Sequence, residues 1–329
     1  MDALSQTLAV VRLSSAIFIN ARFSAPWCYQ SPRADSIVHL LVPGAERLVI
    51  FHLITEGDCF VLLDQDEPVC LSAGDVVLFP KGDAHLMCSE PGLKPASGGA
   101  PLAELLSRRP GQLAYGGGGA ATRLVCGYLA CDARLARMLL AGLPPVVRVN
   151  VRGSAAGLWL ESSVRYALSE ARSPRPGGEA VLAKLSEVLF IEVLRLTMNE
   201  RVEGRTGWLT AVGDRIVGAA LNAMHGQPAH GWTLEELAHS AGTSRSVLAE
   251  RFARLVGSTP MQYLTQWRML LASSLLCQSQ APLASIANDV GYQTDAAFSR
   301  AFRREFGVPP AAWRRRQAAP AQTASAQVS

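Results

Sequence analysis

The sequence predicts a multidomain α+β protein with three parts: a small N-terminal β-barrel, a helical segment, and an all-α C-terminal domain. Three observations support this fold class. Short alternating runs of apolar and polar residues fill the first 131 residues, the apolar spacing then changes to a helical period, and one apolar pattern occurs twice between Trp232 and Arg316. A chain of 329 residues with 49% apolar residues is long enough for two or three domains.

The first predicted domain, residues 1–131, contains short runs separated by glycine, proline and aspartate. Such runs are typical of the strands of a β-sandwich or a small barrel. The runs cover residues 48–54, 59–63, 69–71, 76–79, 85–88 and 124–129. Residues 91–119 are rich in glycine, proline and alanine, so we expect a surface loop there, enclosing a short helix at 102–106.

Residues 132–208 are predicted to form a helical linker. Apolar spacing indicates helices at 133–140, 157–171 and 179–199, and the last has an apolar stripe formed by Leu182, Leu185, Leu189, Val193 and Leu196. Such a stripe fits either a domain core or the seam of a homodimer, and the sequence does not choose between them. We expect a linker at 202–208 and a disordered tail at 317–329.

The predicted C-terminal domain, residues 209–316, contains the repeated pattern. In each copy a short apolar helix ends at a glycine, Gly242 or Gly291, and a second helix follows with apolar residues at i and i+4, which indicates a helix-turn-helix. Thr233 and Glu236 form a capping box at the start of the first copy. Residues 260–277 connect the copies as a helix of ~25 Å.

The second helix of a helix-turn-helix presents its outward residues to base edges in the major groove of DNA. The candidate DNA-binding residues are Ser244, Arg245, Ser246, Ala249 and Glu250 in the first copy, and Gln293, Thr294, Asp295, Ser299, Arg300, Arg303 and Arg304 in the second. Arginine on guanine and glutamate on cytosine are chemically sensible pairs, although Glu250 fits equally well as a solvated charge or a partner of Arg254. The connecting helix could hold the copies near the ~34 Å between successive major-groove faces, so one chain can bind a bipartite site.

The net charge of +4 is unevenly distributed. From Thr206 to the end there are 11 arginines, no lysine and 7 acidic residues, whereas the preceding 205 residues hold 20 basic and 20 acidic residues. The excess positive charge therefore lies with the repeated motif, as a phosphate-binding module requires. Arginine suits bidentate contacts with phosphate or guanine, although high-GC codon usage explains the absence of lysine equally well.

Gly74, Pro80, Gly82 and His85 form the pattern G-x5-P-x-G-x2-H, which resembles the second motif of cupin barrels. The first cupin motif needs an H-x-H pair and a glutamate, but only His52 stands in that region, so we expect no metal, no cofactor and no catalytic residue. We expect His52 and His85 to be structural or to line a pocket. The candidate effector pocket comprises Trp27, His52, Phe60, Phe79 and His85.

The repeated segment resembles the AraC/XylS family of bacterial transcription regulators. The strongest marks are Ala238-x-x-Ala-Gly242, Arg251-Phe252, Gly257-Ser-Thr-Pro260, Trp267-Arg268, Ile286-Ala287-x-x-Val-Gly-Tyr292 and Phe306-Gly-Val-Pro-Pro310. The N-terminal part is similar to the cupin-type domain of a subset of that family, through Ser24-Ala-Pro-Trp27, Tyr115-Gly-Gly-Gly-Gly119 and Cys126-Gly-Tyr128. Glu250 departs from the pattern, because relatives frequently carry arginine there.

This resemblance implies a cytoplasmic, non-enzymatic regulator that binds double-stranded promoter DNA and contacts RNA polymerase. Its N-terminal domain would receive a small-molecule or oxidant signal, modulate promoter binding and often mediate a homodimer. The alternative is a metal-dependent cupin enzyme with a DNA-binding appendage, which the incomplete ligand set disfavours. No run of eighteen apolar residues exists, so we expect no membrane partner.

The seven cysteines contain no C-x-x-C pair, which argues against a structural zinc site or a secreted disulfide framework. Some relatives with this architecture respond to reactive chlorine or other oxidants through cysteines. Cys28 and Cys88 are the candidate redox residues on that reading, whereas inert buried thiols are the alternative for most of the seven.

Overall fold

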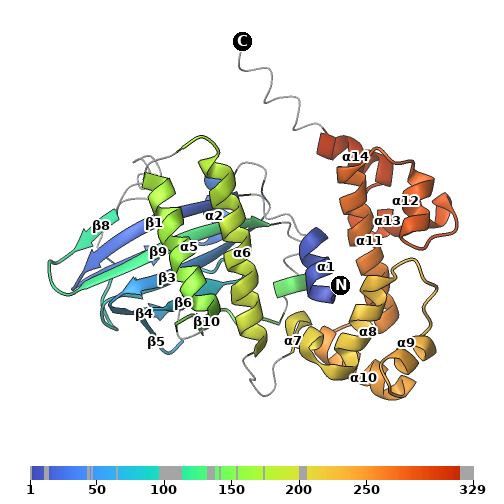
Figure 1. Ribbon diagram of the computed structural model, residues 1–329, viewed down its shortest axis with the longest axis horizontal. Helices are drawn as coiled ribbons and strands as arrows, with labels where there is room; N and C mark the ends of the chain where they lie inside the picture. The colour runs from blue at the N-terminus through green and yellow to red at the C-terminus, as the bar shows by residue number, and fades with distance from the viewer. Residues whose placement is uncertain are drawn as a thin grey trace, which may run out of the picture. The chain divides into compact units, whose positions relative to one another are not determined.

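The structure is a computed structural model that describes residues 2–10, 15–42, 45, 47–63, 66–95, 113–131, 138–140, 142–152, 155–172, 175–199 and 206–318. The chain divides into two compact units (Figure 1). One unit comprises residues 12–203, and the other joins residues 1–11 to residues 204–329. The predicted boundaries at 131 and 208 differ from these units, because the fold of the first unit continues past 131 and the N-terminal helix belongs to the second.

The first unit is built on two β-sheets. The larger sheet has the order β10 (Val147–Asn150), β6 (Asp75–Phe79), β3 (Arg47–Glu56), β9 (Ala121–Cys131), β1 (Ser15–Ser24) and β8 (Leu113–Gly116). The smaller sheet has the order β2 (Cys28–Ser31), β7 (His85–Cys88), β4 (Asp58–Leu62) and β5 (Val69–Ser72). Neighbours pair antiparallel except β1 and β8, which are parallel. In the described part of the chain the strands form two sheets, which confirms the predicted β-rich N-terminal domain, although the sheets do not close into a barrel.

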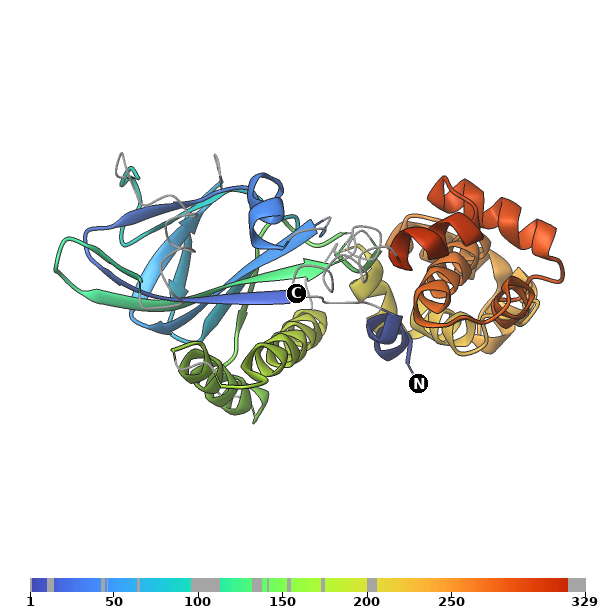
Figure 2. The same ribbon diagram turned by 90° about the horizontal axis from the view of Figure 1, so that it is seen from above.

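Burial on both faces explains the apolar character of the central strand β3. Its Ile50 and Ile54 join the core between the two sheets, together with Val61 and Met87 of the smaller sheet. The alternate residues Phe51 and Leu53 point to the opposite face, which helices α5 (Ala155–Arg172) and α6 (Gly178–Asn199) cover (Figure 2). Helix α2 (Ala34–Leu41) packs against β3.

Several local predictions need correction. The loop expected at 91–119 includes a strand, β8, because Tyr115 pairs with Phe23 of β1. Trp208, predicted to lie in a linker, begins a helix and is 2% exposed. The helix expected at 102–106 lies outside the described residues, as do residues 133–137 of the helix expected at 133–140 and residues 319–329 of the tail expected at 317–329. Residues 317 and 318, expected in that tail, instead end the helix Pro310–Ala318.

The second unit is all α. Its helices are α7 (Trp208–Gly213), α8 (Arg215–Gly226), α9 (Leu234–Ser240), α10 (Arg245–Val256), α11 (Pro260–Gln278), α12 (Leu283–Asp289), α13 (Asp295–Phe306) and α14 (Pro310–Ala318). The N-terminal helix α1 (Ala3–Val10) packs on α8, where the Ala3 backbone N–H donates to Asn222 Oδ1 at 2.7 Å. Among the helices described, none has the length and hydropathy to cross a membrane.

Candidate nucleic-acid interface

The first helix-turn-helix consists of α9 and α10, and local capping sets both helix starts. Thr233 Oγ1 accepts from the Glu236 N–H at 3.2 Å, and the Glu236 carboxylate accepts from the Thr233 N–H at 2.8 Å. The capping box predicted from sequence is therefore confirmed. Ser244 caps α10 by accepting from the Val247 N–H at 3.3 Å. Gly242 has φ +64° in the turn, a conformation that favours glycine.

Helix α10 buries one face and exposes the other. Its Leu248, Phe252 and Leu255 are buried, as the apolar spacing predicts. Among the predicted DNA-binding residues of this copy, those exposed are Ser244, Arg245, Ser246 and Glu250, and Ala249 is half-buried. Val247, which is not among the predicted DNA-binding residues, is also 44% exposed at the start of the helix.

The second helix-turn-helix consists of α12 and α13 and repeats this design. Thr294 caps α13 by accepting from the Ala297 N–H at 3.2 Å, and Gly291 has φ +83° in the turn. Phe298, Phe302 and Phe306 are buried. Of the predicted residues, those exposed are Gln293, Thr294, Asp295, Arg300, Arg303 and Arg304, and Ser299 is half-buried. The outward face thus carries three arginines.

An ion pair that the sequence did not indicate fastens the first recognition helix. Arg251 of α10 donates from Nε and Nη2 to Asp214 Oδ2 at 2.9 and 2.6 Å. Asp214 also caps α8, because its Oδ1 accepts from the Ile216 and Val217 N–H groups at 3.0 and 2.9 Å. Burial opposes ionisation of Asp214, but the hydrogen bonds from Arg251 and the backbone outweigh it and hold the pKa of this carboxyl below its usual value.

A buried polar cluster supports the same recognition helix from beneath. Trp208 Nε1 donates to Tyr263 Oη at 2.6 Å, so the Tyr263 hydroxyl donates to His225 Nε2 at 2.7 Å. The His225 ring stacks on Trp267 with centroids 3.8 Å apart. Burial lowers the pKa of His225 to about 3, so the imidazole is neutral. Trp208 is a core residue of the DNA-binding unit for this reason.

In the other unit, a hydrogen-bonded chain occupies the space between the sheets. His85 Nδ1 lies 2.9 Å from the Asp83 carbonyl and donates to it, which leaves His85 Nε2 to accept from His52 Nε2 at 2.8 Å. His52 Nδ1 then accepts from the Cys126 thiol at 2.9 Å. Burial lowers the pKa of both histidines and raises that of Cys126, so all three groups are neutral. These hydrogen-bonded side chains link β3 and β9 of the larger sheet to β7 of the smaller one.

This arrangement does not fit a cupin metal. The facing nitrogens of His52 and His85 bond each other, and within the described residues no group of three or more His, Cys, Asp or Glu is placed to hold a metal ion.

The five predicted effector residues do not all lie on the same side of the smaller sheet. Phe79 and His85 stack with centroids 3.6 Å apart and His52 lies beside them, as predicted. Trp27 packs against Phe23, and Phe60 is half-buried. Phe60 points to the outer face of the smaller sheet, because its neighbours Cys59 and Val61 point into the core.

The outer face of the smaller sheet carries the two predicted redox cysteines. Cys28 and Cys88 are direct partners across β2 and β7 and form a disulfide with Cα atoms 4.1 Å apart. Phe60 and Cys70 continue the same row across β4 and β5, and Cys70 is an exposed free thiol. By contrast, burial raises the pKa of Cys59 in the core to about 12. Cys28 and Cys88 are buried beneath this outer face, whereas Cys70 is exposed on it.

Sequence reasoning also missed an apolar pocket between the larger sheet and its covering helices. Its lining comprises Phe51, Leu53, Val76, Leu78, Leu129, Val151, Leu160, Val164, Leu189, Phe190 and Val193. Leu189 and Val193 belong to the stripe that the sequence assigned to either a core or a dimer seam. They are buried against the sheet within one chain.

Two helix-turn-helix units with exposed recognition helices define the class of protein, which is a DNA-binding protein with two DNA-reading units on one chain. The unit formed by α9 and α10 is called the first reading head below, and the unit formed by α12 and α13 the second. Comparison with protein families agrees. Residues 2–199 match a family described as cupin, and residues 237–316 match one described as a helix-turn-helix domain.

Relatives extend along the whole chain. An AraC-like transcription regulator of Streptomyces antibioticus is 33% identical and covers 96% of this chain and 99% of its own length. The RCS-specific HTH-type transcriptional activator RclR of Escherichia coli is 28% identical, over 96% of this chain and 98% of its own. The crystal structure of the AdpA DNA-binding domain with a target DNA is 32% identical and covers 32% of this chain and 96% of that chain, with a TM-score of 0.31. The chain belongs to the AraC-like family of DNA-binding transcription regulators, which are not enzymes.

Proposed function

We propose that the chain binds a bipartite promoter site through α10 and α13, under the control of a signal received by residues 12–203. The observation that carries this proposal is the exposure of polar and arginine side chains on the outward faces of both recognition helices. Arg245 and Ser246 open α10 outward, and Arg300, Arg303 and Arg304 lie outward on α13. These side chains supply guanine and phosphate contacts in the major groove, while each helix is held from behind by its buried apolar face.

DNA selected from a random pool by the full chain would reveal the site. We expect a recovered sequence with two conserved segments about one helical turn apart, bound in preference to scrambled DNA. Recovery of unrelated sequences, or equal affinity for the scrambled control, would contradict sequence-specific binding. The regulator acts in the cytoplasm, contacts RNA polymerase at the promoter, and forms a homodimer where two chains occupy one promoter. Sedimentation with and without the selected DNA measures that last step.

The signal we favour is a two-electron oxidant, because Cys28 and Cys88 lie directly opposite each other on the outer face of the smaller sheet. Their two thiols would lose two electrons and two protons to a hypohalous acid or a peroxide and form the disulfide. The oxidant would be reduced to water with a halide ion or an alcohol.

A promoter reporter tests the oxidant signal. Cys28→Ser and Cys88→Ser should each abolish the response to hypochlorite, whereas Cys70→Ser, in the same row of the sheet, should leave it intact. An unchanged response in both variants would refute the proposal. It would favour instead a small apolar molecule in the pocket beneath α5 and α6, which Leu160→Trp should then block.

A further inference from the structure

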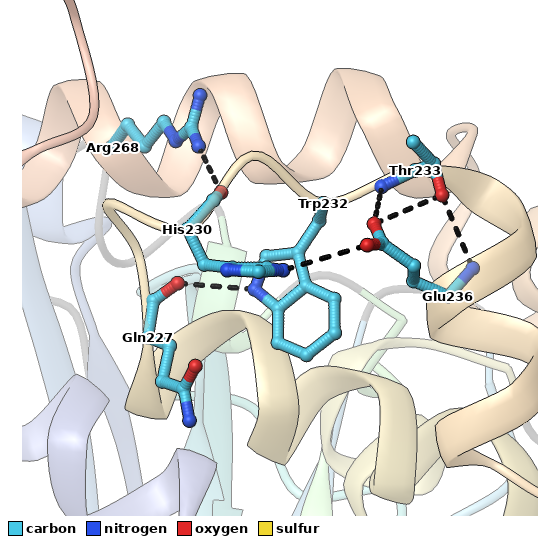
Figure 3. A network of polar contacts seen from close by, with 6 residues as sticks. All are labelled: Gln227, His230, Trp232, Thr233, Glu236 and Arg268. Atoms are coloured by element: carbon cyan, nitrogen blue, oxygen red, sulfur yellow. Dashed lines mark hydrogen bonds and ion pairs between the residues drawn. The ribbon is translucent and has the colours of Figure 1, made fainter.

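The loop between α8 and α9 is tied to the helix that connects the two reading heads (Figure 3). Arg268 of α11 donates from Nε to the Pro228 carbonyl and from Nη2 to the His230 carbonyl, both at 2.7 Å. Trp232 Nε1 donates to the Gln227 carbonyl at 3.0 Å, which closes the loop on itself. One guanidinium therefore satisfies two loop carbonyls and fixes the loop against α11.

The loop 227–232 also contacts the second reading head. Gly291 lies in the turn between α12 and α13, and a Cβ atom at this position would lie 2.9 Å from both Ala229 Cα and Ala229 O. The same Cβ would lie 2.9 Å from Arg268 Nη2. A glycine is needed here for its φ of +83° and also for the close approach of the loop. The turn of the second head thus packs directly on backbone that belongs to the first.

The residue after Gly291 is also partly removed from solvent. Tyr292 is half-buried. Arg268 is itself half-buried. Three pieces of chain therefore meet at one point: the loop of the first head, the middle of α11, and the turn of the second head.

A single connecting helix sets the distance between two domains better than it sets their rotation, because a helix bends and its ends can twist. A second contact beside α11 removes that freedom. The two recognition helices must reach successive major-groove faces, and one added base pair displaces a half-site by about 3.4 Å along the DNA. Small rotations between the heads therefore change which half-site spacing fits.

We propose that Arg268 and Gly291 are positioning residues that lock the two heads together through Ala229, and that this lock selects the spacing between the half-sites read by one chain. Neither residue needs to touch DNA for this role. This role concerns the affinity for two half-sites that one chain binds at the same time.

The test is equilibrium binding of the full chain to its selected DNA, to versions with the spacer changed by one base pair, and to versions with one half-site scrambled. Gly291→Ala and Arg268→Gln should weaken binding at the natural spacing roughly tenfold. Both variants should also flatten or shift the preference among spacers. Arg268→Gln should keep the affinity for either single half-site within about twofold. Gly291→Ala should keep the affinity for the first half-site but also weaken the second, because its φ of +83° strains any side chain. Arg268→Lys keeps the positive charge but loses the planar guanidinium that donates to two carbonyls at once, so its loss of affinity should be intermediate.

Gly242→Ala is the matched control. Gly242 occupies the equivalent turn of the first head with φ +64°, but its Cβ would meet nothing within 4 Å. This variant should weaken every DNA that carries the first half-site and keep the wild-type spacing preference. Retained half-site binding shows that each variant is folded.

The proposal would be overturned if both variants lost the same affinity for every DNA. It would also be overturned if Arg268→Gln and Gly291→Ala both kept the wild-type dependence of affinity on spacer length. Failure of the wild-type chain to select any sequence would count against the proposed bipartite reading instead.

Discussion

The two reading heads have the same backbone design but are held by different forces. The first head relies on polar links: the Asp214 and Arg251 ion pair and the buried Trp208, Tyr263 and His225 cluster. The second relies on aromatic packing, in which Phe302 lies within 4.3 to 6.0 Å of Phe298, Phe306 and Trp313 by ring centroid. A repeated fold therefore requires the same apolar positions and caps, whereas its remaining stability can come from either source.

Removal of the central aromatic ring should give the largest effect and separate the two heads. Phe302→Ala should cost about 3–5 kcal/mol of unfolding free energy, because a buried ring leaves a cavity. Phe252→Ala, at the equivalent position of α10, should cost less within this range, because Phe252 has Tyr263 as its ring neighbour at 5.6 Å. Denaturant unfolding monitored by tryptophan fluorescence measures both. A larger loss in Phe252→Ala would contradict the comparison.

Removal of the ion pair should damage the first head alone. Asp214→Ala leaves two N–H groups of α8 uncapped and Arg251 without its partner, so we expect a loss of about 2–3 kcal/mol. Asp214→Ser keeps a cap and loses only the ion pair, and should recover about half of that. If the serine variant were as unstable as the alanine variant, the cap would carry no part of the effect.

Arginine contacts with DNA should also differ between the heads. Arg300→Ala should weaken binding to the selected site by about 1–3 kcal/mol, as expected for a bidentate contact with guanine. Arg245→Ala should cost less, because Arg245 Nη1 lies 3.8 Å from Glu235 Oε2 and gives up that partner on binding. Glu235→Gln should accordingly strengthen binding slightly. Fluorescence anisotropy at fixed salt measures all three, and equal losses for both arginines would remove the distinction.

Acid should weaken the first head. Burial lowers the pKa of His225 to about 3, against about 6.5 in the unfolded chain, so the unfolded state alone takes up a proton between these values. Stability contributed by neutral His225 is therefore complete above pH 6.5 and falls as the pH drops, by about 1 kcal/mol near pH 5.5. His225→Gln retains an acceptor for Tyr263 but does not titrate, so it should lose this pH dependence of the unfolding free energy. An identical pH slope in the variant and the wild type would refute it.

Local features of the reading heads could be predicted from the sequence. The capping box at Thr233 and the buried residues of α10 and α13 depend on neighbours a few positions away, and such short-range requirements leave a periodic trace. The absence of a converging carboxylate led to the expectation that His52 and His85 are structural or line a pocket, and both belong to a neutral hydrogen-bonded chain.

Contacts between distant segments left no such trace. Asp214 meets Arg251 across 37 positions, and Ala3 meets Asn222 across 219. The meeting of Ala229, Arg268 and Gly291, and the pairing of Cys28 with Cys88, likewise depend on how whole elements pack. The sequence by itself determined two helix-turn-helix heads and a β-rich unit, because helix caps and apolar periods act locally. Only the tertiary structure decided what fastens the heads to each other, because that contact forms between segments with no shared pattern.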